Sequence, residues 1–194
     1  EGASRFLKRI YRLAQESKLA PVGTKVPHDS EGSALALIKI AHKSIISLST
    51  DIENFRFNRA VAQLHILANA IGVVKSTDKG AAAAKRFGIE TLAQLLSPLS
   101  PHIAEEIWQS LGHETMLATT TWPKADESLA ADDEIEVAIQ VNGKLRDTIM
   151  LSRDCENADA EARALESKAI LRYLDGKAPK KVIVVKNRIV NVVI

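Results

Sequence analysis

The spacing of hydrophobic residues along this chain changes once, near residue 123. Before that point, apolar residues recur every three to four positions, which places their side chains on one face of an α-helix. From residue 135 onward, apolar and polar residues alternate, a pattern typical of strands with one buried face. The pattern therefore predicts a helical module followed by a smaller module that contains strands.

Five amphipathic helices are predicted in the first module, at residues 4–17, 31–50, 58–73, 81–97 and about 101–111. We expect Asp29 or Ser30 to cap the second helix and Ser100 to cap the fifth. Gly112 follows the fifth helix, where a glycine can adopt the left-handed conformation that ends a helix. Gly88 lies inside the fourth helix and costs on the order of 1 kcal/mol relative to alanine. Short connections between amphipathic helices predict an antiparallel bundle.

The second module is predicted to have the order β-β-α-β-β. Alternating residues at 135–141 and 145–151 flank Asn142-Gly143, a turn sequence typical of hairpins. Residues 157–174 have helical character in two pieces divided near Ser167, and residues 182–185 and 189–194 form a second hairpin. The predicted fold class is α+β, with a helical bundle at 1–123, a linker at 124–133 and a small α/β domain at 134–194.

The register of the first predicted hairpin depends on one residue. A bare two-residue loop pairs Val141 with Lys144 and puts the apolar residues of the two strands on different faces. One extra residue, in the loop or in a bulge, pairs Val141 with Leu145 and residues 137 and 135 with 149 and 151. We expect the extra residue. It places Asp147 opposite Ile139 on the buried face, where the carboxylate needs a partner or an edge position.

Composition limits the class of protein. The 194 residues are 46% hydrophobic and 26% charged, as in ordinary globular proteins. No apolar run approaches the roughly 20 residues of a membrane span, and no secretory signal opens the chain, so we expect a cytoplasmic protein with no membrane partner. The single cysteine, Cys155, can form neither an intrachain disulfide nor a cysteine cluster for zinc. Because the chain begins at Glu1 and not at methionine, we expect a fragment of a longer protein.

Motifs that carry chemistry are missing. The phosphate-binding, dinucleotide-binding and nucleophile-elbow glycine motifs do not occur. His102, Glu105 and Glu106 lie near one side of a predicted helical turn, but no second histidine is close enough in sequence to complete a zinc site. We therefore expect no catalytic residue, no metal site and no cofactor within this chain.

Positive charge is concentrated near the C-terminus. The whole chain has a net charge of +2, whereas residues 163–188 hold eight basic and two acidic residues, a net charge of +6. Basic side chains on turns of a small sheet can neutralise phosphates, and a second basic group lies on the first helix. The candidate RNA-binding residues are Lys144, Arg146, Lys177, Lys180, Lys181, Lys186 and Arg188, with Arg5, Arg9 and Arg12. Spacing alone fits equally well with charges that only decorate exposed turns and strand edges.

Several segments resemble one family. Residues 96–108, LSPLSPHIAEEIW, followed by Leu111-Gly112 and Trp122-Pro123, resemble the anticodon-binding helical domain of class I aminoacyl-tRNA synthetases for aliphatic amino acids. Residues 1–9, EGASRFLKR, and 55–61, FRFNRAV, are similar to the same domain. Residues 137–147, VAIQVNGKLRD, and 181–193, KVIVVKNRIVNVV, resemble the C-terminal domain of bacterial-type leucyl-tRNA synthetases.

The resemblance implies a parent enzyme that uses ATP to attach leucine to its tRNA. The family's His-x-Gly-His and Lys-Met-Ser-Lys-Ser motifs do not occur here, so ATP would bind in a catalytic domain that this chain lacks. The expected partners are the tRNA for leucine and the parent's catalytic domain, and the expected state is a monomer that is inactive alone. Aromatic residues are scarce at 4%, which favours recognition of the RNA backbone and shape. The alternative is a module that docks on other protein domains and has no RNA affinity.

Overall fold

A computed structural model describes residues 1–16, 18–131, 134–174 and 178–194. Its contacts divide the chain into two compact units, which we call the helical unit (Glu1–Ala131) and the small unit (Asp132–Ile194). The helical unit extends further than the predicted bundle. Ala125 and Leu129, in the segment predicted as a linker, pack against the helical core because they supply two further apolar side chains. Residues 132 and 133 of the predicted linker lie outside the described residues.

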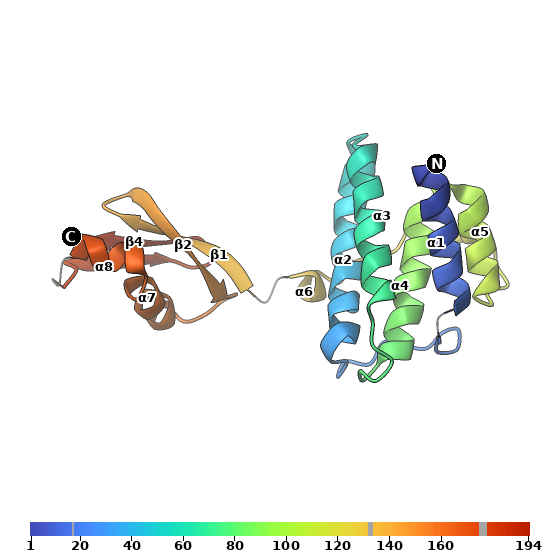
Figure 1. Ribbon diagram of the computed structural model, residues 1–194, viewed down its shortest axis with the longest axis horizontal. Coiled ribbons are helices and arrows are strands. Elements are labelled where there is room, and N and C mark those ends of the chain that lie inside the picture. The colour runs from blue at the N-terminus through green and yellow to red at the C-terminus, as the bar shows by residue number, and fades with distance from the viewer. Residues whose placement is uncertain (17, 132–133, 175–177) are drawn as a thin grey trace. The chain divides into compact units, whose positions relative to one another are not determined.

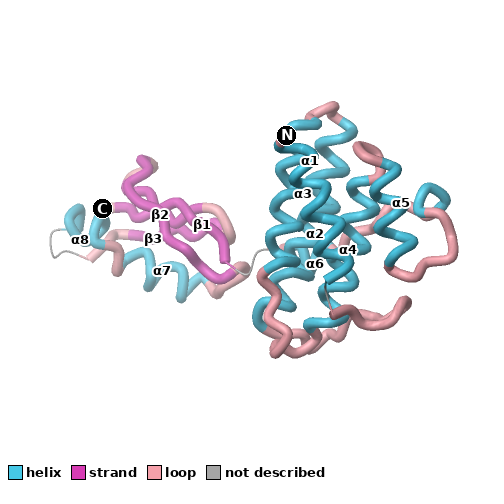
Figure 2. The backbone as a smooth tube through the Cα atoms, turned by 45° about the vertical axis from the view of Figure 1, so that its right-hand side comes forward, coloured by secondary structure: helices cyan, strands magenta, loops and turns pink. Residues whose placement is uncertain are grey.

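The helical unit contains five long helices, which run side by side (Figures 1 and 2). They are α1 (Gly2–Glu16), α2 (Gly32–Glu53), α3 (Phe57–Gly72), α4 (Ala81–Leu96) and α5 (Pro101–Ser110). Two short helices follow, η1 (Leu117–Thr119) and α6 (Glu127–Ala130). The ends of the long helices lie within three residues of their predicted positions. Fully buried leucines from α2, α3 and α4, such as Leu37, Leu64 and Leu92, form the centre of the core.

Gly88 allows α4 to pack closely against its neighbours. A Cβ atom at this position would lie 3.1 Å from both Cδ atoms of Leu37 in α2 and 3.2 Å from Cγ1 of Ile71 in α3. These distances are shorter than ordinary carbon contacts, so a Cβ atom would require Leu37 and Ile71 to shift by a few tenths of an ångström. The glycine that weakens α4 as an isolated helix therefore lies where side chains from two other helices pack closely against it.

The start of α2 differs from the prediction that Asp29 or Ser30 caps it. Glu31 is the N-cap residue, and among the described residues its side chain makes no capping hydrogen bond. Asp78, in the loop between α3 and α4, caps the helix instead, because its Oδ2 accepts a hydrogen bond of 2.7 Å from the backbone N–H of Ser33. Hydrogen bonds from Ser33 hold the pKa of Asp78 below its usual range. Asp29 forms an ion pair with Lys79.

The ends of α5 match the prediction in one respect only. Gly112 has a φ of 91°, so the predicted left-handed stop is confirmed. Ser100 is the N-cap residue, but its side chain makes no capping hydrogen bond within the described part of the chain, so that prediction is wrong. The proline at the first helical position removes one amide that would otherwise need a partner, which reduces the demand for a side-chain cap.

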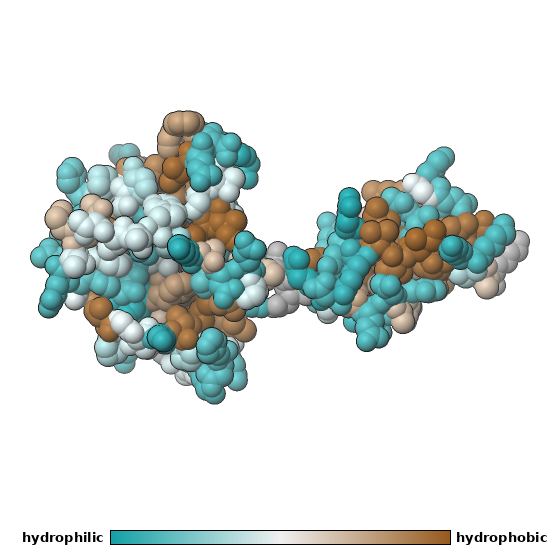
Figure 3. Space-filling model, turned by 180° about the vertical axis from the view of Figure 1, so that it is seen from behind, coloured by the Kyte–Doolittle hydropathy of each residue, from teal (hydrophilic) through white to brown (hydrophobic). Residues whose placement is uncertain are grey.

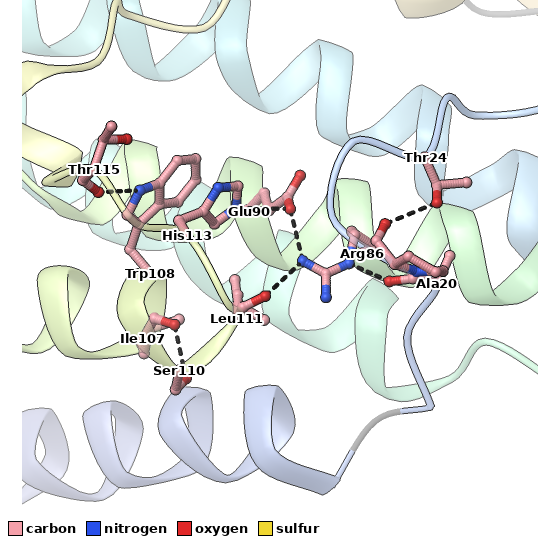
Figure 4. A network of polar contacts seen from close by, with 11 residues as sticks. Ala20, Thr24, Arg86, Glu90, Ile107, Trp108, Ser110, Leu111, His113 and Thr115 are labelled. Carbon is pink, nitrogen blue, oxygen red and sulfur yellow. Dashed lines mark hydrogen bonds and ion pairs between the residues drawn. The ribbon is translucent and has the colours of Figure 1, made fainter.

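A buried arginine joins α4 to two distant segments (Figure 4). Arg86 is 7% exposed, and its Nε donates to the carbonyl oxygen of Ala20. Its Nη1 donates to Glu90 at 2.9 Å and to the carbonyl oxygen of Leu111 at 3.1 Å. Glu90 also contacts Nε2 of His113 at 2.9 Å. One guanidinium therefore holds the loop after α1 and the end of α5 against the middle of α4.

The segment after α5 is held along α2 by two polar contacts. Nε1 of Trp122 donates to Oγ of Ser49 at 2.8 Å. The backbone N–H of Asp126 donates to Nδ1 of His42 at 3.1 Å, and the Asp126 carboxylate caps α6 by accepting from the amide of Ser128 at 2.9 Å. Burial lowers the pKa of His42 below its usual value, and the nearby Asp126 charge offsets part of this effect. His42 is therefore held neutral as a hydrogen-bond acceptor.

The small unit has the predicted α+β arrangement, with its helical part in two pieces. It contains β1 (Glu134–Val141), β2 (Lys144–Ser152), α7 (Asn157–Leu165), α8 (Lys168–Leu174), β3 (Lys181–Val185) and β4 (Ile189–Val193). The sheet order is β2-β1-β4-β3, with β1 and β4 parallel and the other neighbours antiparallel. Its core consists of alternate strand residues such as Val137, Ile139 and Val190, with Ala164 and Ile170 from the helices.

The first hairpin contains the predicted extra residue, as a bulge and not in the loop. Asn142 and Gly143 have φ values of 48° and 78° and form a two-residue turn, so Val141 pairs with Lys144 and the predicted pairing with Leu145 is wrong. The register shifts between Ile139 and Gln140, which pairs residues 137 and 135 with 149 and 151 as predicted. Because the bulge absorbs the extra residue, the turn keeps its favoured length.

Asp147 lies opposite Ile139, as predicted, and has the partner that its position requires. Its Oδ2 accepts a hydrogen bond from Oγ of Ser167, in the connection between α7 and α8. Its Oδ1 accepts from the backbone N–H of Thr148 at 2.9 Å. The Ser167 bond, with a smaller contribution from Thr148, lowers the pKa of Asp147 below its usual value. Strand β2 is also an edge strand, so this carboxylate is only half-buried.

Candidate nucleic-acid interface

The sheet topology separates the predicted basic residues into two groups. Because β1 and β4 are parallel, the turn after β1 lies beside the end of β4. The amide of Gly143 donates to Oδ1 of Asn191 at 3.0 Å, and the amide of Lys180 donates to the carbonyl oxygen of Val193 at 2.9 Å. The exposed residues Lys144, Lys180 and Lys181 therefore lie at the same end of the sheet. We call these three residues the lysine end.

Lys186 and Arg188 lie at the opposite end of the sheet, in the turn between β3 and β4. Nζ of Lys186 lies 3.6 Å from Asp154, which also accepts a hydrogen bond of 2.8 Å from Asn187. The bond from Asn187, followed by the charge of Lys186, lowers the pKa of Asp154. Lys186 therefore helps to join the β3–β4 turn to the loop after β2. Sequence spacing grouped Lys186 and Arg188 with Lys180 and Lys181. The sheet topology places these two pairs at opposite ends of the sheet.

Arg146 is the residue that the bulge adds to β2. Its guanidinium carbon lies 4.7 Å from the centre of the Tyr173 ring in α8, which is a cation–π contact. The contact fixes the arginine at the edge of the sheet and leaves its side chain exposed. Lys177, another predicted site residue, lies outside the described residues.

The basic residues of the first helix share one face of α1. Arg5, Arg9 and Arg12 are spaced by four and three positions, which aligns them along the helix. Arg5 and Arg12 are exposed, whereas Arg9 is half-buried. A Cβ atom placed on Gly72, the last residue of α3, would lie 3.8 Å from Nη2 of Arg9. The arginine side chain therefore runs along the end of α3.

One surface that sequence reasoning did not select lies where α2 meets α3. Residues Phe55, Arg56, Phe57, Asn58 and Arg59 surround a surface hollow there. The rings of Phe55 and Phe57 lie 6.1 Å apart at 80°, and both are exposed. The signal was present in the sequence as an alternation of aromatic and basic residues at a predicted helix break. We call these five residues the Phe55 corner.

Features that would indicate other chemistry are not found. Among the described residues, no group of three or more His, Cys, Asp or Glu side chains could hold a metal ion. Glu105, one of the residues considered for such a site, accepts hydrogen bonds of 2.8 Å from the amides of Leu117 and Ala118 and so fixes η1. In the part of the chain that the structure describes, no helix is long and apolar enough to cross a membrane.

Comparison with known proteins identifies the family. The family model described as the anticodon-binding domain of tRNA ligase matches residues 35–162, and the chain belongs to this family. Relatives that match the whole chain include leucine–tRNA ligases. The chain is 46% identical over its whole length to the leucine–tRNA ligase of Rhodospirillum rubrum and 43% identical to that of Parvibaculum lavamentivorans, covering 23% and 22% of those proteins.

A solved structure supports the same relationship. The chain is similar to LeuRS of Agrobacterium radiobacter K84, agnB2, in a ternary complex with tRNA and LeuAMS. The TM-score is 0.77 and the identity 26%, and the match covers 99% of this chain and 25% of that one. These findings confirm the predicted resemblance to leucyl-tRNA synthetases. The chain spans about a quarter of the length of the relatives it matches.

Proposed function

We propose that this chain is the part of a leucyl-tRNA synthetase that holds the tRNA for leucine. The observation that carries the proposal is the lysine end, where Lys144, Lys180 and Lys181 come together from two segments in a member of the anticodon-binding family. Three exposed ammonium groups on rigid strand ends can neutralise neighbouring phosphates without reading bases. The face of α1 with Arg5, Arg9 and Arg12 provides a second phosphate contact.

In this proposal, the chain contributes binding energy and not chemistry. ATP and leucine bind in the parent's catalytic domain, which is also a partner of this chain, and the chain alone neither holds a cofactor nor aminoacylates. Contacts far from the reacting atoms position the acceptor end of the tRNA, and such positioning accelerates a reaction that occurs elsewhere. The protein is a cytoplasmic monomer.

The first test is binding of a leucine tRNA transcript to this chain across a salt series. Replacing the three residues of the lysine end by alanine should weaken binding and flatten its dependence on salt. Each phosphate contact that is lost removes roughly 0.7 to 0.9 from the slope of log affinity against log salt. The matched control changes Lys18, Lys25 and Lys124 to alanine, which removes the same charge from exposed positions of the helical unit. Equal slopes for the two triple variants would contradict the site.

Lys186 and Arg188 need a separate variant because they lie at the other end of the sheet. Changing both to alanine should reduce the salt slope less than the lysine-end variant does, since Lys186 already has Asp154 as a partner. A larger effect of this double variant on the salt slope would show that the β3–β4 turn, and not the lysine end, makes the main contact with RNA.

A second candidate function is favoured by the outer face of the sheet. Met150, Ile183 and Val185 are between 41% and 52% exposed on the face opposite α7 and α8, where hydrophobic residues form a band (Figure 3). Such a band is typical of a surface that docks on another protein. In that case the basic turns are incidental, and the chain docks on other synthetase domains without RNA affinity. Absence of tRNA binding even at low salt would favour this candidate.

A further inference from the structure

The Phe55 corner exposes aromatic side chains to an unusual degree. Phe55 is 80% exposed and Phe57 is 46% exposed, although both belong to the compact helical unit. The corner surrounds a hollow of about 370 Å³. Figure 3 shows hydrophobic side chains at the end of the helical unit where α2 and α3 meet. The Phe55 ring gains little from burial, so the folding of this unit does not explain why a phenylalanine is present at this position.

The backbone at Phe55 makes the choice of residue more unusual. The amide of Phe55 donates to the carbonyl oxygen of Ile52 at 3.0 Å, and the amide of Arg56 donates to that of Asp51 at 2.7 Å. These two bonds form a Schellman motif, whose left-handed position is usually glycine. Phe55 occupies that position with a φ of 55°, which is strained for a bulky residue. A glycine would end α2 with less strain, so the local backbone preference does not explain the phenylalanine.

Two arginines are held beside these rings by one buried carboxylate. Asp51 is 2% exposed, and its Oδ1 lies 3.7 Å from Nε of Arg56 and 3.4 Å from Nε of Arg59. Oδ2 of Asp51 is buried and has no hydrogen-bond partner among the described residues, so the two arginines provide the charge that balances this group. Their side chains remain 43% and 66% exposed. The guanidinium groups are therefore anchored on one side and accessible on the other.

We propose that the Phe55 corner binds an unpaired nucleotide of the tRNA. The base stacks on the ring of Phe55 with Phe57 against its edge, and Arg56 and Arg59 contact the flanking phosphates. Aromatic rings next to arginines are the combination by which proteins hold unpaired bases, because every base has a π face and every nucleotide a phosphate. A purely apolar protein partner would have to desolvate both arginines without providing anions. The inference rests on the proposed function and adds an aromatic contact in the helical unit.

The test uses the whole 194-residue chain and a leucine tRNA transcript. Phe55→Gly should lower the affinity roughly 5- to 100-fold, the effect of losing one stacked base. The melting temperature of the helical unit should stay the same or rise, because glycine relieves the left-handed strain. Phe55→Tyr should bind like the wild type, whereas Phe55→Leu keeps an apolar side chain without a π face and should bind weakly. The matched control is Val73→Ala, since Val73 is an apolar side chain of the same unit with 70% exposure.

The nucleotide itself is found by chemical probing of the bound tRNA. One unpaired nucleotide should be protected by the wild-type chain and become reactive with Phe55→Gly, while protection of the stems stays unchanged. If the wild type binds with a steep salt slope and Phe55→Gly binds equally well, the inference is wrong and the proposed function stands. If Phe55→Leu binds like the wild type, the contact is not base stacking. If the wild type does not bind at low salt, the inference and the proposed function both fail.

Discussion

The two units bury their hydrophobic residues in different ways. In the helical unit, α2, α3 and α4 enclose a core of fully buried leucines, and the Arg86 network adds polar contacts between distant segments. In the small unit, α7 and α8 cover one face of the four-stranded sheet, and Met150 and Ile183 are exposed among the described residues of the other face. The polar contacts between distant segments of the small unit, such as those from Asp154 to Asn187 and from Asp147 to Ser167, involve exposed or half-buried groups, whereas Arg86 is buried. The apolar core of the small unit is therefore a single layer.

This difference bears on where each unit can carry function. A small domain of about 60 residues has little stability to spare, so strained or unpaired groups are expensive there. Its basic residues lie on turns and strand ends, where an exposed charge costs little folding free energy. The left-handed residues of the small unit other than glycine are Asn142, Asp154 and Asn187, residue types that tolerate this conformation. The helical unit has the larger core and contains a left-handed phenylalanine and a buried carboxylate with one unpaired oxygen.

The largest expected effect follows from shortening Ile139 in β1. This side chain is 0% exposed at the centre of the single core layer. Ile139→Ala should cost about 2–5 kcal/mol, a large fraction of the stability of so small a domain. The small unit should unfold while the helical unit stays folded, and amide hydrogen exchange resolved by residue would show this. The control is Leu92→Ala, a similar truncation at a position of 0% exposure in the helical unit, which should remain folded. If both units of Ile139→Ala unfold together, the proposed difference in stability between the small unit and the helical unit is wrong.

The next effect concerns the Arg86 network, in which a buried guanidinium joins distant segments of the helical unit. Arg86→Met keeps most of the apolar bulk but leaves Glu90 and the carbonyl oxygens of Ala20 and Leu111 without their donor. The free energy of unfolding of the helical unit should fall by about 3 kcal/mol, the cost of breaking a buried ion pair. Urea denaturation followed by tryptophan fluorescence would measure it, because Trp108 stacks on His113 in the same network. Lys85→Met, at the preceding half-buried position, should have little effect; an equal loss there would show that the network is not responsible.

Local patterns were enough to predict the long helices and the hairpins, but not the short helices η1 and α6 or the contacts between distant residues. The spacing of hydrophobic residues predicted all five long helices and both hairpins, because this spacing depends only on residues that are close in sequence. The need for an extra residue in the first hairpin also followed from the pattern, since one apolar face had to form. The pattern did not decide between a longer loop and a bulge, because both restore the same face.

Two of the errors arise from contacts between residues that are distant in sequence. Asp78 caps α2 from 45 residues away, which no local capping rule can find. The position of Lys144 beside Lys180, and not beside Lys186, likewise depends on the parallel pairing of β1 with β4, which joins strands that are far apart in sequence. The Phe55 corner was missed for another reason. Its rings and guanidinium groups are recognisable as a surface only once α2 is known to end in a left-handed residue that leaves them exposed.

The smallest effect is a pH dependence confined to the helical unit. All five histidines lie in that unit, and the small unit has none. His42 is neutral because its pKa is lowered by burial, and its Nδ1 accepts a hydrogen bond from the amide of Asp126. Protonation is therefore easier in the unfolded chain, so the stability from neutral His42 is present above the usual histidine pKa of about 6.5. It is lost as the pH falls below that value, and the loss stops below the lowered folded pKa.

His42→Asn isolates this contribution, because the amide oxygen can accept the same hydrogen bond but does not titrate. Between pH 7.5 and 5.5, the helical unit of the wild type should lose about 1 kcal/mol more stability than the variant, the net value of one hydrogen bond. Denaturant midpoints followed separately for the two units would measure it. The small unit should not respond in this range, because the pKa values of Asp147 and Asp154 are both lowered and these groups titrate only in stronger acid. If the wild type and His42→Asn respond alike, the contact between His42 and Asp126 does not control the acid response.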